Sequence, residues 1–124
     1  MTNSAHQGRR VEHAVRDHLT GHGYEVIRAA ASKGPADLVA IKHGQVLIVN
    51  VKRTALPSPA ERVELCRIAA LLPGVGVPVV ARKPPRRPVR LERLLTPDRA
   101  ASARVPFLAD AAGPMTIPAE GETR

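Results

Sequence analysis

A chain of 124 residues with one tyrosine, one phenylalanine and no tryptophan corresponds to a single domain with an aliphatic core. This shortage of aromatic side chains excludes the RNA-binding and single-strand-binding modules that stack bases on aromatic platforms. The 19 Lys and Arg against 11 Asp and Glu give a net charge of +8, which predicts a polyanionic partner, with nucleic acid first and an acidic membrane surface second.

Apolar residues at helical spacing, namely Val11, Val15 and Leu19, predict a helix over residues 8–22. The pattern further predicts strands at 24–28, 37–41 and 46–52, a helix at 59–72, a strand at 77–82 and one more strand at 89–95. This order predicts an α/β fold with a central mixed β-sheet flanked by helices. These elements form a domain over residues 1–96, and residues 97–124, rich in Ala, Pro and Gly, are predicted to be a flexible or loosely packed tail.

The segment at 42–45 is predicted to form a hairpin turn centred on His43 and Gly44. A two-residue or four-residue loop there pairs position 41 with 46 and places Asp37 opposite Asn50, on one face of the sheet. Lys52 shares that face because side chains alternate along a strand. A three-residue loop would shift the register by one residue, and an ordinary strand end reaching water is the simpler alternative.

Glu12 is the one acidic residue at the border of the apolar stripe of the first predicted helix. A carboxylate in that position needs a partner, because removing a charge from water without one is costly. The simpler interpretation is an ion pair with the nearby Arg16. The alternatives are a hydrogen bond to another group or a bound metal ion.

These residues together form a pattern. Glu12, the run from Ser32 to Ala40 and the run Val49-Asn50-Val51-Lys52 resemble the PD-(D/E)xK nuclease superfamily, and most of all its archaeal and phage-type Holliday junction resolvases. The resemblance covers residues 8–95. It implies a restriction-endonuclease-like core and a metal-dependent, structure-selective endonuclease that hydrolyses DNA phosphodiesters.

The resemblance also implies a metal site for Mg²⁺, with Mn²⁺ as a substitute. Asp37 would be the central ligand, Glu12 would support the metal directly or through water, and Asn50 and the carbonyl of Val51 would complete the set. Magnesium prefers oxygen ligands from a few carboxylates together with waters. The bound ion would lower the pKa of an attacking water and neutralise charge on the phosphate.

Two further catalytic residues follow from the same resemblance. Lys52 would orient the attacking water and stabilise the developing negative charge, and Ser32 would lie near the scissile phosphate. Asn50 departs from the family pattern, which has Glu or Asp two residues before the lysine. Because an amide brings no negative charge, metal affinity and rate should fall. The chain is then a natural variant that still cleaves, a DNA-binding relative that has lost activity, or an engineered protein.

Basic residues cluster in the segment between positions 82 and 93, where a nuclease would contact phosphates and where the simpler interpretation is a solvated face. The predicted DNA-binding residues are Arg9, Arg10, Lys33, Arg53, Arg82, Lys83, Arg86 and Arg87. A four-way junction has near two-fold symmetry, so the predicted assembly is a homodimer that presents two sites to opposing strands.

Two other functions stay open at this point. One is a catalytically impaired DNA-binding relative of the same fold, and the other is a repair or restriction-like nuclease that acts on ordinary duplex. The single cysteine, Cys66, excludes an internal disulfide. The polar N-terminus and the lack of any apolar run near about 20 residues predict a cytoplasmic, nucleoid-associated protein without a membrane segment.

Overall fold

The computed structural model describes residues 3–29, 34–98 and 101–107. Its elements are α1 (Asn3–Gly21), β1 (Glu25–Arg28), β2 (Leu38–Lys42), β3 (Gln45–Lys52), α2 (Pro59–Ala70), β4 (Gly76–Arg82), β5 (Arg90–Leu94), the 3₁₀ turn η1 (Ala101–Ala103) and β6 (Arg104–Pro106). All six strands form one sheet in the order β1-β2-β3-β4-β5-β6. Strands β3 and β4 are parallel and the other neighbours are antiparallel, so the sheet is mixed as predicted.

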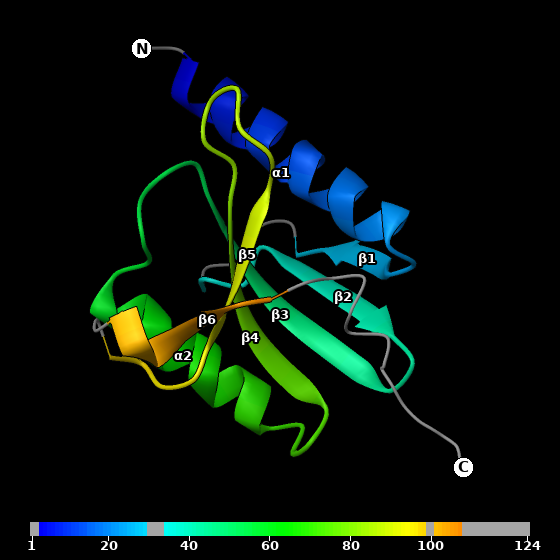
Figure 1. Cartoon of the computed structure of the whole chain (residues 1–124), viewed down its shortest axis with the longest axis vertical. Helices are drawn as coiled ribbons and strands as arrows, with labels where there is room; N and C mark the ends of the chain where they lie inside the picture. Colours follow the sequence, from blue (N-terminus) through cyan, green and yellow to red (C-terminus); the bar gives the residue numbers. More distant parts are fainter. Residues whose placement is uncertain (1–2, 30–33, 99–100, 108–124) are drawn as a thin grey trace.

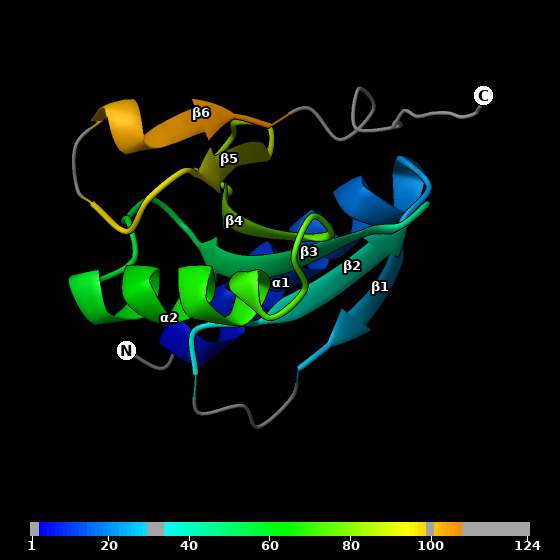
Figure 2. The same ribbon diagram turned by 90° about the horizontal axis from the view of Figure 1, so that it is seen from below.

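The two long helices cover opposite faces of this sheet (Figures 1 and 2). On the α1 face, Val15 and Leu19 pack with Leu47 and Val49 of β3 in the larger core cluster. On the other face, Leu65 of α2 packs in a second cluster with β3 and β4. Burial of these aliphatic side chains is the main force that holds the three layers together. Within the described part of the chain, neither helix is long and apolar enough to cross a membrane.

The turn between β2 and β3 has two residues, His43 and Gly44, with φ of 44° and 75°. Positive φ at both positions is the conformation that matches the right-handed twist of a hairpin. The observed register pairs Ile41 with Val46 and Val39 with Ile48, which confirms the predicted register. Strand β2 begins at Leu38, however, so the regular ladder ends one residue before Asp37.

Helix α2 begins behind Ser58, whose hydroxyl accepts from the backbone N–H of Glu61. The Glu61 carboxylate in turn accepts from the backbone N–H of Ser58, so the two residues form a capping box. Arg62, one residue later, is buried, and its guanidinium donates to the carbonyls of Pro57 and Pro97. These contacts tie the start of α2 to the segment that follows β5.

Residues 101–107 extend the sheet beyond the predicted domain boundary. Strand β6 pairs with β5, and the backbone N–H of Phe107 donates to the carbonyl of Leu91. The Phe107 side chain packs against the core cluster on the α1 face. The boundary after residue 96 stays a prediction, and residues 108–124 of the predicted tail lie outside the described residues.

Gly76 starts β4 where the strand passes closest to the end of α2. A Cβ at this position would overlap the carbonyl oxygen of Ala69. We therefore expect Gly76→Ala to lower the free energy of unfolding by about 1–3 kcal/mol, the usual cost of overpacking. Urea unfolding measures this loss. Gly21→Ala, at the exposed end of α1 where a Cβ meets open space, is the matched control and should cost little. Equal stability of the two variants would contradict the close packing of α2 on β4.

Candidate active site

Asp37 lies directly before β2 and is held from three directions. Its backbone N–H donates to the carbonyl of Val49 at 2.8 Å, and its carbonyl accepts from the N–H of Ala29 at 3.0 Å. Its carboxylate accepts from the N–H of Val51 at 2.8 Å. The backbone of Asp37 is thus fixed between β1 and β3, and its side chain points toward Val51.

Glu12 of α1 and Asp37 line the same pocket, which has a volume of about 430 Å³. The pocket is lined by Gly8, Arg9, Glu12, Arg28, Asp37 and Val51. The Glu12 carboxylate accepts from Nε of Arg28 at 2.8 Å, and its side chain is only 17% exposed. Arg28, at the end of β1, is therefore the ion-pair partner of Glu12 in place of the expected Arg16. No sequence pattern indicated this contact, because Arg28 is brought to α1 only by the fold.

Burial raises the pKa of the Asp37 carboxyl above its usual value, and the Val51 N–H opposes this shift. The negative charge of Glu12 raises the pKa of Asp37 further, the positive charge of Lys52 lowers it, and the charge of Glu61 raises it. Two partly buried carboxylates that repel each other favour a cation between them. The two carboxylates fit a divalent ion that takes its other ligands from waters, although the described residues contain no cluster of three His, Cys, Asp or Glu.

Lys52 ends β3 and reaches the first turn of α2. Its Nζ lies 3.3 Å from a carboxylate oxygen of Glu61, and the two side chains are 28% and 32% exposed. The Ser58 N–H that caps α2 lowers the pKa of Glu61, and burial opposes the shift. The sequence analysis missed Glu61. The spacing of a capping box, Ser-x-x-Glu, was the available signal.

Asn50 is buried in β3 and is bonded to the segment before β2. Its side chain is 2% exposed, its Nδ2 donates to the carbonyl of Pro35 at 2.8 Å, and its Oδ1 is buried without a partner. Within the described part of the chain, no hydrogen bond joins Asn50 to Asp37. The reason is the early end of the ladder: the Asp37 N–H bonds to Val49, so the carboxylate turns toward Val51. Asn50 remains on the alternate face of β3, which it shares with Lys52.

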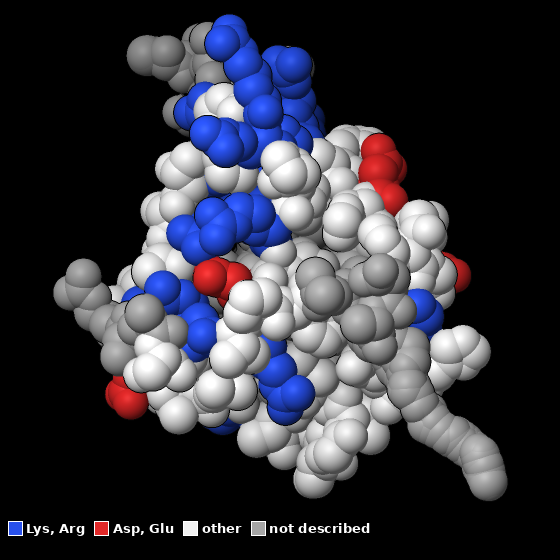
Figure 3. All heavy atoms as spheres, viewed as in Figure 1, with Lys and Arg blue, Asp and Glu red and all other residues white. Residues whose placement is uncertain are grey.

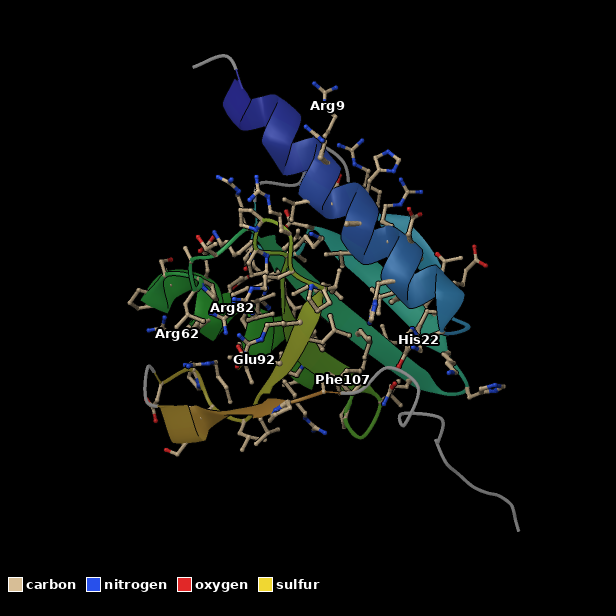
Figure 4. All side chains as sticks on the ribbon, turned by 45° about the horizontal axis from the view of Figure 1, so that its top comes forward. Arg9, His22, Arg62, Arg82, Glu92 and Phe107 are labelled. Atoms are coloured by element: carbon tan, nitrogen blue, oxygen red, sulfur yellow. The ribbon has the colours of Figure 1, made fainter. Side chains whose placement is uncertain are left out.

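A basic hollow of about 370 Å³ lies on the other side of α1, against the loop between β4 and β5. Its cationic lining residues are Arg10, Arg53, Lys83 and Arg86. Lys and Arg side chains gather over this part of the molecule (Figure 3), and Arg9 lies near the N-terminal end of α1, far from His22 at the other end (Figure 4). The fold thus brings together four of the predicted DNA-binding residues from three parts of the chain.

The other predicted contacts are placed differently. Arg82 and Glu92 turn toward each other on neighbouring strands (Figure 4), with Nη2 of Arg82 2.7 Å from the Glu92 carboxylate. The Arg82 side chain is 18% exposed and is held by Glu92, so Arg82 is not part of the proposed DNA surface. Arg87 is exposed in the β4–β5 loop, and Ser32 and Lys33 lie outside the described residues.

Comparison with known proteins gives the family. A family model of archaeal Holliday junction resolvases (Hjc) matches residues 3–94. The chain belongs to the archaeal Holliday junction resolvase family. These resolvases are structure-selective DNA endonucleases, and as a class they generally depend on a divalent metal, so the resemblance seen in the sequence is confirmed.

A solved structure supports the same assignment. Hjc of Archaeoglobus fulgidus, a Holliday junction resolvase from an archaeal hyperthermophile, superimposes with a TM-score of 0.58 and 32% sequence identity. The match covers 68% of this chain and 70% of that one. No curated protein sequence matches the chain significantly. The nuclease fold expected for a resolvase is therefore confirmed.

We expect Asp37→Asn to raise the melting temperature at pH 7, because the folded protein then no longer holds a buried carboxylate beside Glu12. Burial raises the pKa of Asp37 in the folded state, so the Asp37 carboxyl of the wild type binds a proton more tightly in the folded than in the unfolded protein. The advantage of the variant should shrink as the pH falls through the folded pKa, and vanish below the unfolded value of about 3.9. Thermal melts across this pH range measure it.

Asp17→Asn is the control for this experiment, because Asp17 is exposed on α1 and its substitution makes the same change in charge as Asp37→Asn. A gain at pH 7 in both variants would reflect net charge alone. A loss of stability in Asp37→Asn at pH 7 would contradict the burial cost at Asp37.

Proposed function

We propose that this chain cleaves four-way DNA junctions by hydrolysing phosphodiesters with Mg²⁺, for which Mn²⁺ can substitute. The single observation that supports it is that Glu12 and Asp37 line one pocket, with Lys52 close enough for its charge to act on Asp37, in a member of the resolvase family. Paired carboxylates beside a lysine are the groups that metal-assisted hydrolysis of a phosphodiester requires. As an enzyme that acts on DNA, the protein is predicted to be cytoplasmic, and nucleoid association stays a prediction.

Each residue of the pocket has a proposed role. Asp37 and Glu12 would hold the metal, and Val51, which lines the same pocket, would supply its carbonyl as a third oxygen ligand. When bound, such an ion would lower the pKa of the attacking water and neutralise charge on the phosphate. Lys52 orients that water and stabilises the negative charge that develops on the phosphate. Arg28 donates to one carboxylate oxygen of Glu12, so the second oxygen would remain available to a metal ion.

An impaired DNA-binding relative is the second candidate, and Asn50 is the observation that favours it. The Asn50 side chain is buried against Pro35 and brings no charge, so the site lacks the carboxylate that this position has in the family pattern. The enzyme remains the better proposal because both carboxylates of the pocket and Lys52 are retained. The third candidate is a nuclease that acts on ordinary duplex. A comparison of cleavage of a four-way junction with cleavage of linear duplex distinguishes it from the proposed function.

The basic hollow is the proposed DNA-binding surface. Arg10, Arg53 and Lys83 can contact successive phosphates on one side of α1, while the scissile phosphate enters the carboxylate pocket on the other side. Such contacts position the nucleic acid without reading its sequence, as recognition of a junction by shape requires. A homodimer would place two such pockets on opposing strands of the junction.

Asp37→Ala and Lys52→Ala should each abolish cleavage of a labelled four-way junction in Mg²⁺ or Mn²⁺ while leaving most of the binding intact. The affinity comes from the basic surface, and the chemistry comes from the pocket. Gel assays with junction and with linear duplex, each with and without metal, measure both properties. Asp17→Ala is the control. Wild-type cleavage by either pocket variant would exclude this pocket as the active site, and binding without metal-dependent cleavage by the wild type would favour the impaired relative.

Binding should weaken steeply with salt, because Arg and Lys contacts to phosphates release condensed counterions. Arg53→Ala/Arg86→Ala removes two cations from the basic hollow and should lower the slope of log K against log salt by about 2. Junction and duplex should be affected alike. Arg67→Ala/Arg93→Ala removes the same charge from exposed positions on α2 and β5, and its slope should stay unchanged. Equal slopes for the two double variants would show that the hollow faces away from DNA.

A further inference from the structure

The site lacks a carboxylate on β3. Asn50 occupies the position where the family pattern has an acid, and it is neutral, buried and bonded to the backbone of Pro35. Lys52, two residues later, therefore has no acidic neighbour on its own strand, because the intervening residue is Val51. A lysine at the edge of a partly buried site needs a nearby anion to hold its ammonium in one place.

Glu61 of α2 is that anion. Its carboxylate oxygens lie 3.3 and 3.4 Å from Nζ of Lys52, and both side chains are about two-thirds buried. The negative charge of Glu61 also acts on Asp37, whose pKa it raises. Glu61 therefore belongs electrostatically to the carboxylate pocket, although it comes from the opposite layer of the fold.

The Glu61 side chain is held in place by the start of α2. One carboxylate oxygen accepts from the Ser58 N–H at 2.8 Å, and the Glu61 N–H donates back to the Ser58 hydroxyl at 3.2 Å. The turn that carries these residues is itself anchored by buried Arg62. Glu64, one turn further along, differs from Glu61: it pairs with Arg67 on the exposed side of the helix.

We propose that Glu61 is a positioning residue that supplies, from α2, the negative charge that Asn50 does not supply from β3. It holds the Lys52 ammonium near Asp37. It would also restore, at the metal site, the negative charge that Asn50 lacks. The inference rests on the proposed function, since it assigns Glu61 a part in the same hydrolytic site. It also explains how a chain with asparagine at position 50 can keep a working site.

The test is Glu61→Gln, which removes the charge and keeps the fold, because glutamine at this helical position can still complete a capping box. Single-turnover cleavage of the four-way junction should slow roughly ten- to a hundredfold, as expected for loss of a charged hydrogen bond. Junction affinity should not change, since Glu61 does not grip DNA. The rise in melting temperature that Mn²⁺ produces in the wild type should become smaller, which is a readout independent of cleavage.

Glu64→Gln is the matched control, with the same change in charge on the same helix, and it should behave as the wild type. Asn50→Glu introduced into Glu61→Gln returns the missing carboxylate from β3 and should restore both cleavage and the Mn²⁺ shift. If the longer side chain lowers the melting temperature, Asn50→Asp serves instead. A merely structural role for Glu61 would not be rescued by an acid at position 50.

The outcomes separate the two proposals. If the wild type cleaves and Glu61→Gln cleaves equally fast with the same Mn²⁺ shift, the inference about Glu61 is wrong and the proposed function stands. A folded double variant that stays as slow as Glu61→Gln overturns the compensation. Absence of metal-dependent cleavage in the wild type overturns the proposed function and this inference with it.

Discussion

The turn at His43 and Gly44 is the constraint on which the site depends. Its two residues both have positive φ, which leaves β2 and β3 a single register. A slip of one residue would exchange the faces of every side chain on the hairpin. The observed register sends Val49 to the α1 core and leaves Lys52 on the α2 side. The pocket therefore forms where the hairpin opens, at the end furthest from its turn.

Charges from both layers of the fold meet at this end of the sheet. Glu12 and Arg28 come from the α1 side, Lys52 and Glu61 come from the α2 side, and Asp37 lies between them. Glu12 and Glu61 each have a cationic partner at short distance, whereas the one hydrogen bond to the Asp37 carboxylate from the residues that the structure describes comes from a backbone N–H. Asp37 is thus the acid with the least compensation, in agreement with its raised pKa. A metal ion would gain most at this residue.

The local pattern of the chain was enough to predict strands β1 to β5, the two helices and the hairpin register, and the family resemblance brought Glu12 and Asp37 together as an acidic pair. It could not predict the partners of these residues, because Arg28 lies 16 residues from Glu12 and reaches it only through the sheet. It also could not predict that the ladder ends at Leu38, so that the Asp37 carboxylate bonds to the N–H of Val51 and is not paired with Asn50 across the ladder. Strand β6 was missed for a different reason: three residues that end in Pro106 carry no strand signal of their own.

Helix α1 joins the two halves of the proposed function. Consecutive residues on its first turns face different sides: Arg9 lines the carboxylate pocket, and Arg10 lines the basic hollow. Successive helical residues point about 100° apart, so one helix forms a wall of both hollows. A DNA backbone bound by Arg10 and Arg53 would therefore lie close to Glu12. Any shift of α1 would move the phosphate-binding residues and the carboxylate pocket together. Val15 and Leu19 fix the same helix in the core by packing. The packing of the interior therefore determines how accurately a bound phosphate is positioned next to the carboxylates of Glu12 and Asp37.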